Sequence, residues 1–552
     1  MPHPLFEKHQ TLLRQAVAAI ESRGYWSPYA EGPRAYGETA IEDGRRAFEA
    51  YRGAQFYLDQ PGVVDRGGAE VSPYGLPLNI SYPRCSADAL IDAGKAAMPG
   101  WVRAGADTRA GVCLEILARL NAGSFEMAHA VMHTTGQALM MAFQAAGPHA
   151  QDRGLEAVAC AWREMKHVPD RAIWEKAQGK NSPLKMEKKF TIVPRGVALV
   201  IACSTFPTWN GYPGLFASLV TGNPVIVKAH PTVILPLALA VSVARQVLKE
   251  AGFDPNLVSL LIDDPAAPVA KDVAMRPEVR LIDYTGGPDF GNWLEQNCRH
   301  AMVYTEKAGV NCVVVDSIDD YKAMLKNLAF TLSLYSGQMC TTPQSIFVSR
   351  EGVKTPEGVV SSEQFGRDLA NAVSRLLEDP ARAVEVLGAI QSPATLARLE
   401  AADELGEVLR VSSAIAHPQW PDARVRSPLI LKVPVEDQGA YAEERFGPIS
   451  FVVETATAAE SLATAERLIR EQGAITFALY STNPLLVERA EETALRVGVA
   501  LSINLTGAVF VNQSAGFSDF HATGANPAAN ACLTDSAFVA SRFFVVQSRR
   551  HL

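Results

Sequence analysis

A cysteine in the stretch 336-SGQMCTT-342 is the first candidate for chemistry in this sequence. Gly337 allows a tight turn and a close approach of the backbone to a ligand. The stretch follows an expected helix and precedes an expected strand, which would expose the thiol of Cys340 at a domain junction. A thiolate there could attack a carbonyl carbon. The alternative is a buried structural cysteine, which is the common role of a free thiol.

A glutamate, a lysine and a glycine-containing turn could complete a site. Glu306, expected in a loop within 304-YTEKAGVN-311, could act as general base on the thiol or on a water molecule, although most loop glutamates are simply solvated. Lys228 ends an apolar run and could reach a nucleotide ribose or phosphate, or only extend along the surface. The glycines of 284-YTGGPDFG-291 suit phosphate binding at the start of a helix, although an ordinary strand-to-helix turn reads the same way.

Strands and helices that alternate along the chain must position these residues. In the first half we expect strands at 197–202, 225–228, 258–262 and 280–284, and a helix at 232–250. In the second half we expect strands at 310–315, 345–348 and 449–456, and helices at 320–334, 364–377, 393–401 and 458–473. This alternation predicts parallel sheets covered by helices, with ligands beyond the carboxyl ends of the strands.

Three further segments are expected outside that alternation. Residues 86–165 have apolar residues at helical spacing, with one helix across 109–132. The runs 186–196 and 537–549 alternate like strands. Because an apolar terminal strand needs a partner edge, we expect the second run to pair with another strand, which another subunit could supply.

Composition excludes several classes of protein. The chain has 552 residues, 48% hydrophobic, with a net charge of −8, which argues against a nucleic-acid binder. The N-terminus lacks a signal-peptide pattern, and the longest apolar run, 233–244, falls short of the roughly 20 residues that span a bilayer. We therefore expect a cytoplasmic protein without a membrane partner. The eight cysteines form no CxxC pair or zinc-type cluster, so we expect no metal.

The joint order of the motifs is more specific than any one of them. They occur in the sequence and approximate spacing of the aldehyde dehydrogenase superfamily: Gly196, Lys228, 285-TGG-287, Glu306, Cys340 and 444-ERFGP-448. The resemblance runs from about residue 85 to the C-terminus. It implies an α/β fold with a Rossmann-type cofactor domain, an α/β catalytic domain and a small β oligomerisation element.

The resemblance also implies domain limits and an assembly. We expect an N-terminal extension at 1–80, a dinucleotide-binding domain at 81–185 and 193–306, and a catalytic thiol domain at 307–505. The oligomerisation strands would be 186–192 and 535–552. A homodimer or homotetramer is implied.

Within the superfamily the sequence is similar to the PaaN group, which is associated with phenylacetic acid degradation. The similarity rests on FEKHQ, RGYWSPY and YGET near the N-terminus and on 201-IACSTFPTWNGYPG-214. It suggests a semialdehyde substrate, which could carry a CoA thioester. The segment 513–526 falls where the family builds its aldehyde entrance. Phe517, Phe520 and His521 could line that entrance, or could equally pack the domain interface.

The resemblance assigns a role to each candidate residue. Cys340 would attack the aldehyde to form a thiohemiacetal, hydride would pass to NAD(P), and Glu306 would activate the water that hydrolyses the thioester. Lys228 and Glu444 would hold the riboses and Phe446 the nicotinamide side. The expected cofactor-binding residues are Ala202, Cys203, Lys228, His230, Gly286, Gly287, Glu444 and Phe446.

Two positions depart from the family pattern. Thr205 stands where the family has an asparagine that holds the oxyanion, and a hydroxyl offers one donor on a shorter arm. Asn210 could substitute if the intervening loop bends. Pro231 stands where many NAD-preferring members have a glutamate that bonds the ribose. Because no carboxylate is present there, and Lys228 and His230 are near, we expect NADP ahead of NAD.

Two rival functions stay open at this stage. In a CoA-acylating dehydrogenase a thiol would resolve the thioester, but Glu306 favours hydrolysis. A catalytically weak ligand-binding or assembly subunit would explain Thr205, but both Cys340 and Glu306 are retained.

Overall fold

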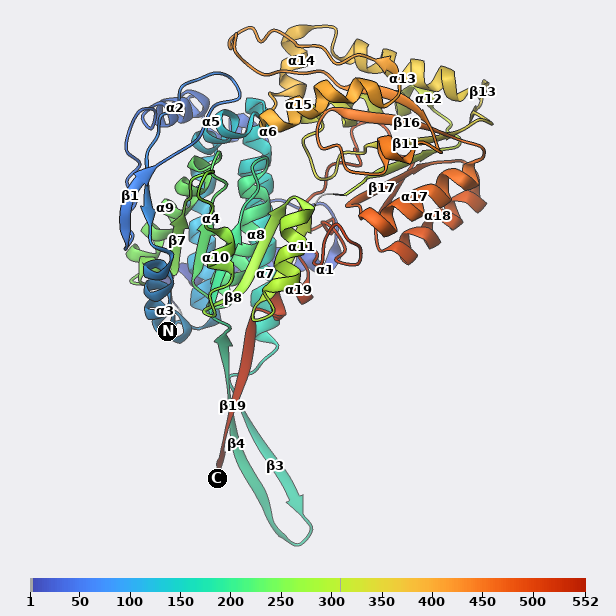
Figure 1. Ribbon diagram of the computed structural model, residues 1–552. Helices are drawn as coiled ribbons and strands as arrows, with labels where there is room; N and C mark the ends of the chain where they lie inside the picture. Colours follow the sequence, from blue (N-terminus) through green and yellow to red (C-terminus); the bar gives the residue numbers. More distant parts are fainter. Residues whose placement is uncertain (1–2, 308) are drawn as a thin grey trace.

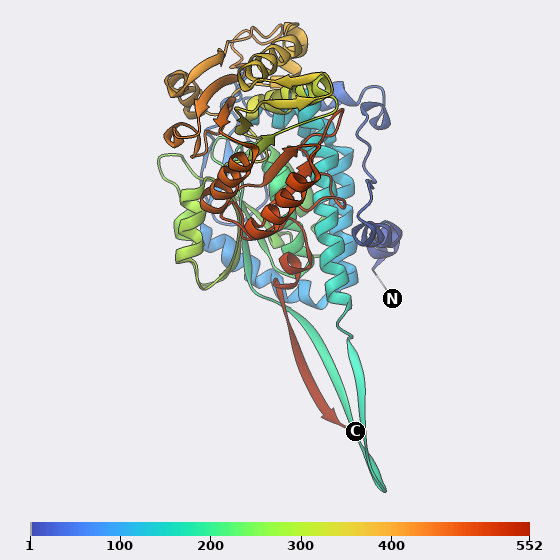
Figure 2. The ribbon, with the colours of Figure 1, turned by 90° about the vertical axis from the view of Figure 1, so that its right-hand side faces the viewer.

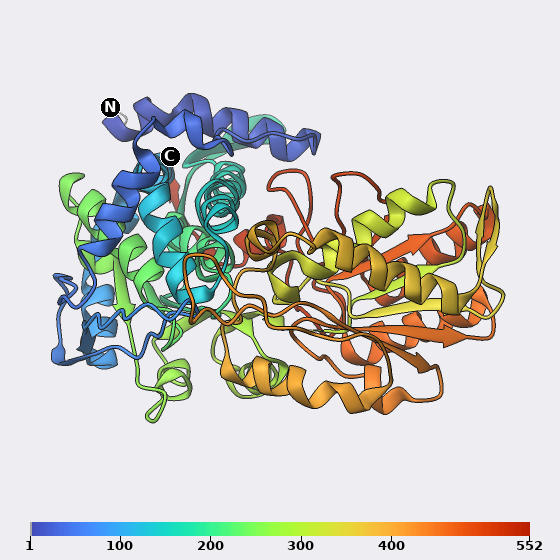
Figure 3. The ribbon, with the colours of Figure 1, turned by 90° about the horizontal axis from the view of Figure 1, so that it is seen from above.

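Two α/β lobes and a protruding β arm make up the chain (Figure 1). The computed structural model describes residues 3–307 and 309–552, so Ala308, within the predicted 304–311 motif, lies outside the described residues. Seen from above, the lobes lie side by side (Figure 3). Within the described ranges, no helix is long and apolar enough to cross a membrane.

The first lobe is built on a five-stranded parallel sheet in the order β7-β6-β5-β8-β9. Its strands are β5 (Val197–Ile201), β6 (Val225–Lys228), β7 (Val258–Leu261), β8 (Val279–Gly286) and β9 (Met302–Lys307). The chain runs outward from β5 to β7 and then returns to β8 on the other side of β5. Ligands bind at such a reversal of strand order, beyond the carboxyl ends of the strands.

Helices cover both faces of this sheet because alternate strand residues point to opposite sides. Ala198 and Val200 pack with α8 (Pro207–Val220) and α9 (Leu235–Glu250). The opposite face, with Val197 and Leu199, packs against three helices: α3 (Ala87–Arg103), α10 (Ala270–Ala274) and α11 (Pro288–Asn297). Behind α8 and α9 lies a further helical layer of α4 (Gly105–Ala122), α5 (Ser124–Thr135) and α7 (Ala150–Lys166).

The second lobe has a seven-stranded sheet in the order β14-β15-β16-β11-β10-β17-β18, parallel except for β14. Its strands are β10 (Cys312–Val315), β11 (Ser345–Ser349), β14 (Glu407–Arg410), β15 (Leu429–Pro434), β16 (Ile449–Thr455), β17 (Thr476–Tyr480) and β18 (Ala500–Ile503). One face packs against α17 (Ala458–Gln472) and α18 (Pro484–Val497). The other packs against α12 (Tyr321–Ser333), α13 (Ser362–Leu376) and α14 (Pro380–Leu387).

Shorter elements complete the two lobes. They are η1 (Pro33–Tyr36), α6 (Leu139–Gln144), η2 (Ala145–His149), η3 (Pro255–Leu257), η4 (Leu334–Gly337), β12 (Val353–Thr355), β13 (Gly358–Val360), α15 (Pro393–Ala401), η5 (Ala402–Leu405) and α16 (Gln438–Tyr441).

The arm is a three-stranded antiparallel sheet in the order β19-β4-β3. Its strands are β3 (Arg171–Gln178), β4 (Asn181–Pro194) and β19 (Phe543–His551). Figures 1 and 2 show it projecting away from both lobes, with the C-terminus on it. Apolar side chains on β19 are half exposed there, namely Phe544, Val545 and Val546.

The first 80 residues contribute to the core of the first lobe. They contain α1 (Pro4–Ser22), α2 (Ala40–Glu49) and β1 (Val63–Gly67), which pairs with β2 (Tyr82–Cys85). Leu13 and Ala16 of α1 are fully buried in the same cluster as Ala198 of β5. The buried Gln60 side chain donates to the carbonyl of Leu260 on β7 at 2.8 Å.

Three sequence expectations need correction. The strand expected at 537–549 begins only at Phe543, because α19 (Ser536–Ala540) precedes it and the Asp535 side chain caps that helix at 2.7 Å. The helix expected across 109–132 is two helices, separated at Gly123. The strand expected at 186–196 is the longer β4, and its hairpin partner β3 was not anticipated.

Candidate active site

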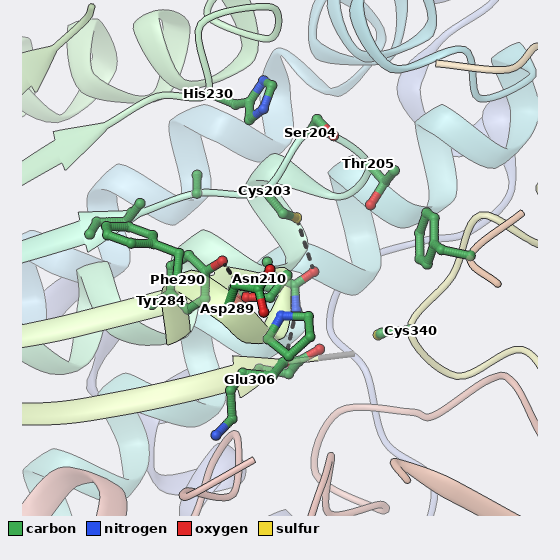
Figure 4. A pocket seen from close by; sticks show the side chains of 18 of the residues that line it. Cys203, Ser204, Thr205, Asn210, His230, Tyr284, Asp289, Phe290, Glu306 and Cys340 are labelled. Atoms are coloured by element: carbon green, nitrogen blue, oxygen red, sulfur yellow. Dashed lines mark hydrogen bonds between the residues drawn. The ribbon is translucent and has the colours of Figure 1, made fainter. Parts of the chain in front are cut away.

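A cavity of about 1180 Å³ lies between the lobes, at the carboxyl ends of β5, β6, β8 and β9. All the residues predicted for catalysis and cofactor binding line it: Ala202, Cys203, Thr205, Asn210, Lys228, His230, Gly286, Gly287, Glu306, Cys340, Glu444 and Phe446. Figure 4 shows the part of this cavity around Cys203, Asn210, Glu306 and Cys340. The structure therefore brings the predicted residues together, while their individual roles stay predictions.

Cys340 follows a turn that few sequences can form. Tyr335, Ser336 and Gly337 all have positive φ, between 48° and 65°, which is costly for the two residues that have a Cβ. A Cβ on Gly337 would lie 2.6 Å from the carbonyl oxygen of Gly447, so only glycine fits there. The Ser336 hydroxyl holds the turn by donating to the carbonyl of Arg426 at 2.9 Å.

Asn311 fixes the backbone on the other side of the thiol. Its amide donates to the carbonyls of Cys340 at 2.8 Å and Thr342 at 3.1 Å. Its side-chain oxygen accepts from the backbone N–H groups of Ile475 and Thr476, both at 2.9 Å. Sequence reasoning did not single out Asn311, although it ends the quoted 304–311 motif. One buried side chain thus joins the segment of the nucleophile to the start of β17.

Glu306 lies on strand β9, not in a loop as its sequence context suggested. The side chain is buried, with 3% of the residue exposed. Oε2 accepts a hydrogen bond from Nδ2 of Asn210 at 3.0 Å. Among the described residues, none donates a hydrogen bond to Oε1 in good geometry. Oε1 lies 3.1 Å from Nε2 of His521. A buried, ionisable carboxylate beside the thiol is placed to accept a proton from a bound water molecule.

The pKa values of the thiol and the carboxylate are moved in opposite directions. Burial, followed by the negative charge of Glu306, raises the pKa of the Cys340 thiol well above its usual value. Burial also opposes ionisation of Glu306, but His521, Cys340 and Asn210 together outweigh it and lower the pKa of that carboxyl. Glu306 is therefore ionised at neutral pH, while Cys340 needs help to lose its proton.

Asn210 forms a hydrogen bond with Glu306, whereas Thr205 lies on the loop before α8. Asn210, in the first turn of α8, uses its amide on Glu306, and its oxygen lies 3.8 Å from the sulfur of Cys203 (Figure 4). The backbone carbonyl of Thr205 accepts a hydrogen bond from Gln137 at 2.8 Å, which fixes the loop before α8. Asn210 is thus already engaged by the carboxylate, while the oxyanion role of Thr205 stays a prediction.

Lys228 meets a carboxylate that sequence reasoning missed. Its Nζ lies 2.8 Å from Oδ1 of Asp263, which follows β7, and both side chains are buried. His230 accepts from or donates to Thr232 at 2.9 Å, and burial followed by the charge of Lys228 lowers the pKa of its ring to about 4. His230 is therefore neutral at physiological pH. The strand order places β7 beside β6, a pairing that no local sequence pattern specified.

The remaining predicted cofactor residues lie at the two ends of the cavity. Gly287 caps the N-terminus of α11, where backbone N–H groups suit a phosphate, and a Cβ there would meet open space. Glu444 faces the cavity from the other lobe, and burial raises the pKa of its carboxyl to about 8. The carbonyl of Phe446, two residues on, accepts a hydrogen bond from Arg398 at 2.6 Å. These residues fit a dinucleotide stretched between the lobes.

A second cavity, of about 760 Å³, opens on the other side of Cys340. Its wall is largely aromatic and methionine-rich: Trp26, Met140, Met141, Phe206, Trp209, Phe330, Met339 and Phe510. Cys340 and Phe206 line both cavities. Cys340 therefore lies where the two cavities meet.

Only one of the three residues expected at the aldehyde entrance lines this second cavity. His521 does, with its ring edge against Trp209 at a centroid distance of 4.6 Å. Phe517 is fully buried in the core of the first lobe and packs at 4.8 Å from Trp26. Phe520 lies half exposed under the guanidinium of Arg23, 3.9 Å away.

Comparison with known proteins decides the family. The aldehyde dehydrogenase family model matches residues 82–513. The chain belongs to the aldehyde dehydrogenase family. This match confirms the fold and the enzyme class predicted from the sequence, and with them an NAD(P) cofactor. It does not show that the chain is a member of the PaaN group.

Solved aldehyde dehydrogenases share the whole architecture. An enzyme from Burkholderia multivorans, described as an NAD-dependent aldehyde dehydrogenase, is 58% identical over 100% of both chains, with a TM-score of 0.98. A 1-pyrroline-5-carboxylate dehydrogenase from Thermus with bound NAD is 16% identical, covers 96% of this chain and 99% of its own, and has a TM-score of 0.72. At that identity the second shows the fold alone.

Curated aldehyde dehydrogenases are more distant. A 1-pyrroline-5-carboxylate dehydrogenase from Bacillus cytotoxicus is 24% identical over 61% of this chain and 63% of its own length. A vanillin dehydrogenase from a Pseudomonas strain is 25% identical over 59% of this chain and 65% of its own. The chain thus aligns with less than two thirds of the length of these relatives.

Proposed function

We propose that this aldehyde dehydrogenase oxidises an aldehyde to a carboxylic acid with a nicotinamide dinucleotide, and that hydrolysis rather than transfer to CoA releases the product. The observation that carries the proposal is the position of Cys340 between the two cavities, with the buried Glu306 beside it. The thiolate and carboxylate would perform successive halves of one reaction.

The chain's own groups account for both halves. The thiolate of Cys340 attacks the aldehyde carbon, and the carbonyl oxygen takes negative charge that Thr205 and the Cys340 backbone N–H can stabilise. When bound, the nicotinamide supplies the hydride acceptor. Glu306 Oε1 then takes a proton from water, which attacks the thioester and frees the acid. The retained base argues against the CoA-acylating and non-catalytic alternatives.

For the nucleotide we propose NAD, in place of the NADP preference expected from Pro231. That expectation counted charges only on the loop after Lys228. Asp263 supplies the missing carboxylate from the neighbouring strand, and the neutral His230 offers no charge to a 2'-phosphate. The relative from Burkholderia multivorans, described as NAD-dependent, agrees with this choice.

For the substrate we propose an uncharged aldehyde with an aromatic or apolar body. The acids and histidines that line the second cavity are Glu31, Glu385, Asp152, Asp519, His149 and His521, and its described lining holds no lysine or arginine. A carboxylate or a CoA phosphate would therefore find no cation there. The similarity to the PaaN group favours an aldehyde from aromatic degradation, and the cavity disfavours its CoA-linked form.

The test is aldehyde-dependent formation of reduced nucleotide, followed by absorbance. Phenylacetaldehyde and benzaldehyde are compared with para-carboxybenzaldehyde, a CoA-linked semialdehyde and an aliphatic aldehyde, with and without added CoA. We expect kcat/KM for the uncharged aromatic aldehydes to exceed that for the carboxylated one by about tenfold or more, which is about 1.4 kcal/mol. Equal turnover of the carboxylated aldehyde would contradict the substrate class, and no turnover beyond that of Cys340→Ala would contradict the function.

We also propose that the arm joins subunits into a homodimer or homotetramer. Both outer strands of the arm, β19 and β3, have an edge without a partner strand within the described chain. Unpaired edges with exposed apolar residues are suited to strand pairing with a second copy.

A further inference from the structure

A buried histidine that the family's predicted mechanism does not use faces both reactive groups. Nε2 of His521 lies 4.0 Å from the sulfur of Cys340 and 3.1 Å from Oε1 of Glu306. Only 3% of the residue is exposed. The thiol, carboxylate and imidazole atoms all lie within 4.8 Å of one another.

The imidazole is held in this position from two sides. Trp209 of α8 packs against it edge-on, with an interplanar angle of 75°. The backbone carbonyl of His521 accepts a hydrogen bond from the N–H of Leu533 at 2.9 Å, which ties its loop to a distant segment. A ring fixed by packing and by its own backbone is preorganised for proton transfer.

The thiol needs such a partner. Burial and the negative charge of Glu306 both oppose ionisation of the Cys340 thiol, yet the thiolate is the form that must attack the aldehyde. Glu306 could take the thiol proton, but it would then be protonated when it is next needed as the base for water. A second base removes that conflict.

We propose that His521 is a catalytic base that activates Cys340, which leaves Glu306 for the hydrolytic half of the reaction. The proposal rests on the function proposed above. The S–H bond of Cys340 breaks and an N–H bond forms at Nε2, which gives a thiolate and an imidazolium. Glu306 Oε1, 3.1 Å from that nitrogen, stays ionised and stabilises the imidazolium.

The thiol and the carboxylate both face Nε2, whereas in a Ser-His-Asp triad the carboxylate holds the opposite ring nitrogen. The distance of 4.0 Å from sulfur to nitrogen is long for a hydrogen bond, as is common before substrate binds. Glu306 differs from a purely orienting carboxylate because Asn210 holds its other oxygen beside the thiol.

Other charged groups around the imidazole are already paired. The Asp519 carboxylate accepts from the backbone N–H of Ala515 at 2.8 Å. Arg153 lies behind Trp209, 5.1 Å from its ring, and pairs with Glu156 at 2.9 Å. Arg23 lies over Phe520 and contacts the same Glu156 at 3.3 Å. The reactive groups that face the imidazole nitrogen are therefore Cys340 and Glu306.

The test measures thiolate formation without turnover. Iodoacetamide labelling of Cys340 is followed by mass spectrometry from pH 5 to 10, with a chelator present, in the wild type and in His521→Gln. In the wild type we expect labelling well below the pH at which a buried thiol ionises. In the variant we expect the rate at pH 7 to fall by about tenfold or more, since each pKa unit changes the thiolate fraction tenfold.

Cys203 is the internal control, because it lines the first cavity, whereas His521 lines the second. Its labelling, and NAD binding, should be unchanged in the variant. Equal pH profiles for Cys340 in the two proteins would overturn the proposal even if the enzyme were an active dehydrogenase.

A second measurement needs no histidine variant. The thiolate absorbance of wild type minus Cys340→Ala, recorded against pH, should show the thiolate near neutral pH. Its appearance only at alkaline pH would reject His521 as the base. Since neither measurement uses an aldehyde, failure here and failure of the proposed function give different results.

Discussion

The carboxylate of Asp263 lies 2.8 Å from the ammonium of Lys228, beyond the ends of the neighbouring strands β7 and β6. The two residues are 35 positions apart in the printed sequence and meet only because the strands pair in parallel. Lys228 is the residue expected at the adenosine ribose, so Asp263 brings a negative charge to the place where a 2'-phosphate would bind.

We predict that Asp263→Asn shifts the nucleotide preference toward NADP. The ratio of kcat/KM for NADP to that for NAD should rise by about tenfold, since removing a repulsion of roughly 1.4 kcal/mol changes the ratio tenfold. Both values come from steady-state rates at fixed aldehyde. Asp272→Asn removes an exposed charge from α10 of the same lobe and should leave the ratio unchanged. An unchanged ratio in Asp263→Asn would disprove the role of this carboxylate.

A second prediction separates the two halves of the reaction. Glu306→Gln keeps a side chain of similar shape beside Cys340 but cannot accept a proton from water. Rapid mixing should show a burst of reduced nucleotide followed by turnover slowed by about 10²- to 10⁴-fold. Cys340→Ala should show neither phase. A Glu306→Gln enzyme with normal steady-state turnover would mean that another group serves as the hydrolytic base.

The third prediction distinguishes Thr205 from Asn210. Thr205→Val removes the hydroxyl while keeping the shape, and should slow the burst by about 10²-fold if this residue holds the oxyanion. Asn210→Ala frees Oε2 of Glu306, which its amide contacts at 3.0 Å, and should slow hydrolysis more than the burst. Both rates come from the same rapid-mixing traces. The opposite pattern would assign the oxyanion to Asn210.

The buried carboxyl of Asp152 should make the free energy of unfolding depend on pH. Burial raises the pKa of its carboxyl from 3.8 to about 8 in the folded protein. Between those pH values the folded state binds more protons than the unfolded state, so stability falls as pH rises through this window. At pH 8 the free energy of unfolding of Asp152→Asn should therefore exceed that of the wild type by on the order of a few kcal/mol. Near pH 4 the two free energies should be alike.

Thermal unfolding measured across this pH range checks the prediction. The Ser27 hydroxyl, which donates to Asp152 at 3.0 Å, can also donate to an asparagine oxygen, so the variant can keep this hydrogen bond. The exposed Asp88→Asn serves as the matched control, because its folded environment is open to water. A constant difference between wild type and Asp152→Asn over the whole pH range would contradict the buried neutral carboxyl.

The exposed apolar residues of the arm predict that copies of the chain associate through it. Val546 on β19 is 54% exposed and would be covered if a second copy paired with the arm. Val546→Asp should therefore convert oligomers to monomers in sedimentation experiments, while Ser548→Asp on the same strand, which adds the charge at a polar position, should have a smaller effect. Oligomers that persist in Val546→Asp would place the interface elsewhere.

The sequence predicted the parallel lobes well because their strands are short apolar runs followed by turns and helices. β6 ends at Lys228 and α15 spans 393–401, both as expected. Glu306 was placed in a loop because β9 is an edge strand with few apolar residues. The helix α19 was missed because Ala537, Phe538 and Val539 suit a strand as well as a helix, and only the Asp535 cap decides between them.

The site could be predicted only where its residues lie on recognisable motifs. Cys340, Glu306 and Lys228 carry such motifs, and all three line one cavity. Asp263 and Asn311 do not, because their importance comes from strand pairing and from contacts with segments far along the chain. His521 was noticed as an entrance residue, but its contact with both reactive groups depends on a loop whose path no local pattern specifies.

The wall that Tyr25, Trp26 and Glu31 give to the second cavity has an evolutionary consequence. These residues precede position 82, where the match to the family begins. A segment before the matched region thus adds to the wall of the cavity that we propose for the aldehyde. Exchange of residues 23–31 between related enzymes could therefore change which aldehydes are oxidised and leave the reaction itself intact. Substrate range could then diversify faster than the catalytic core.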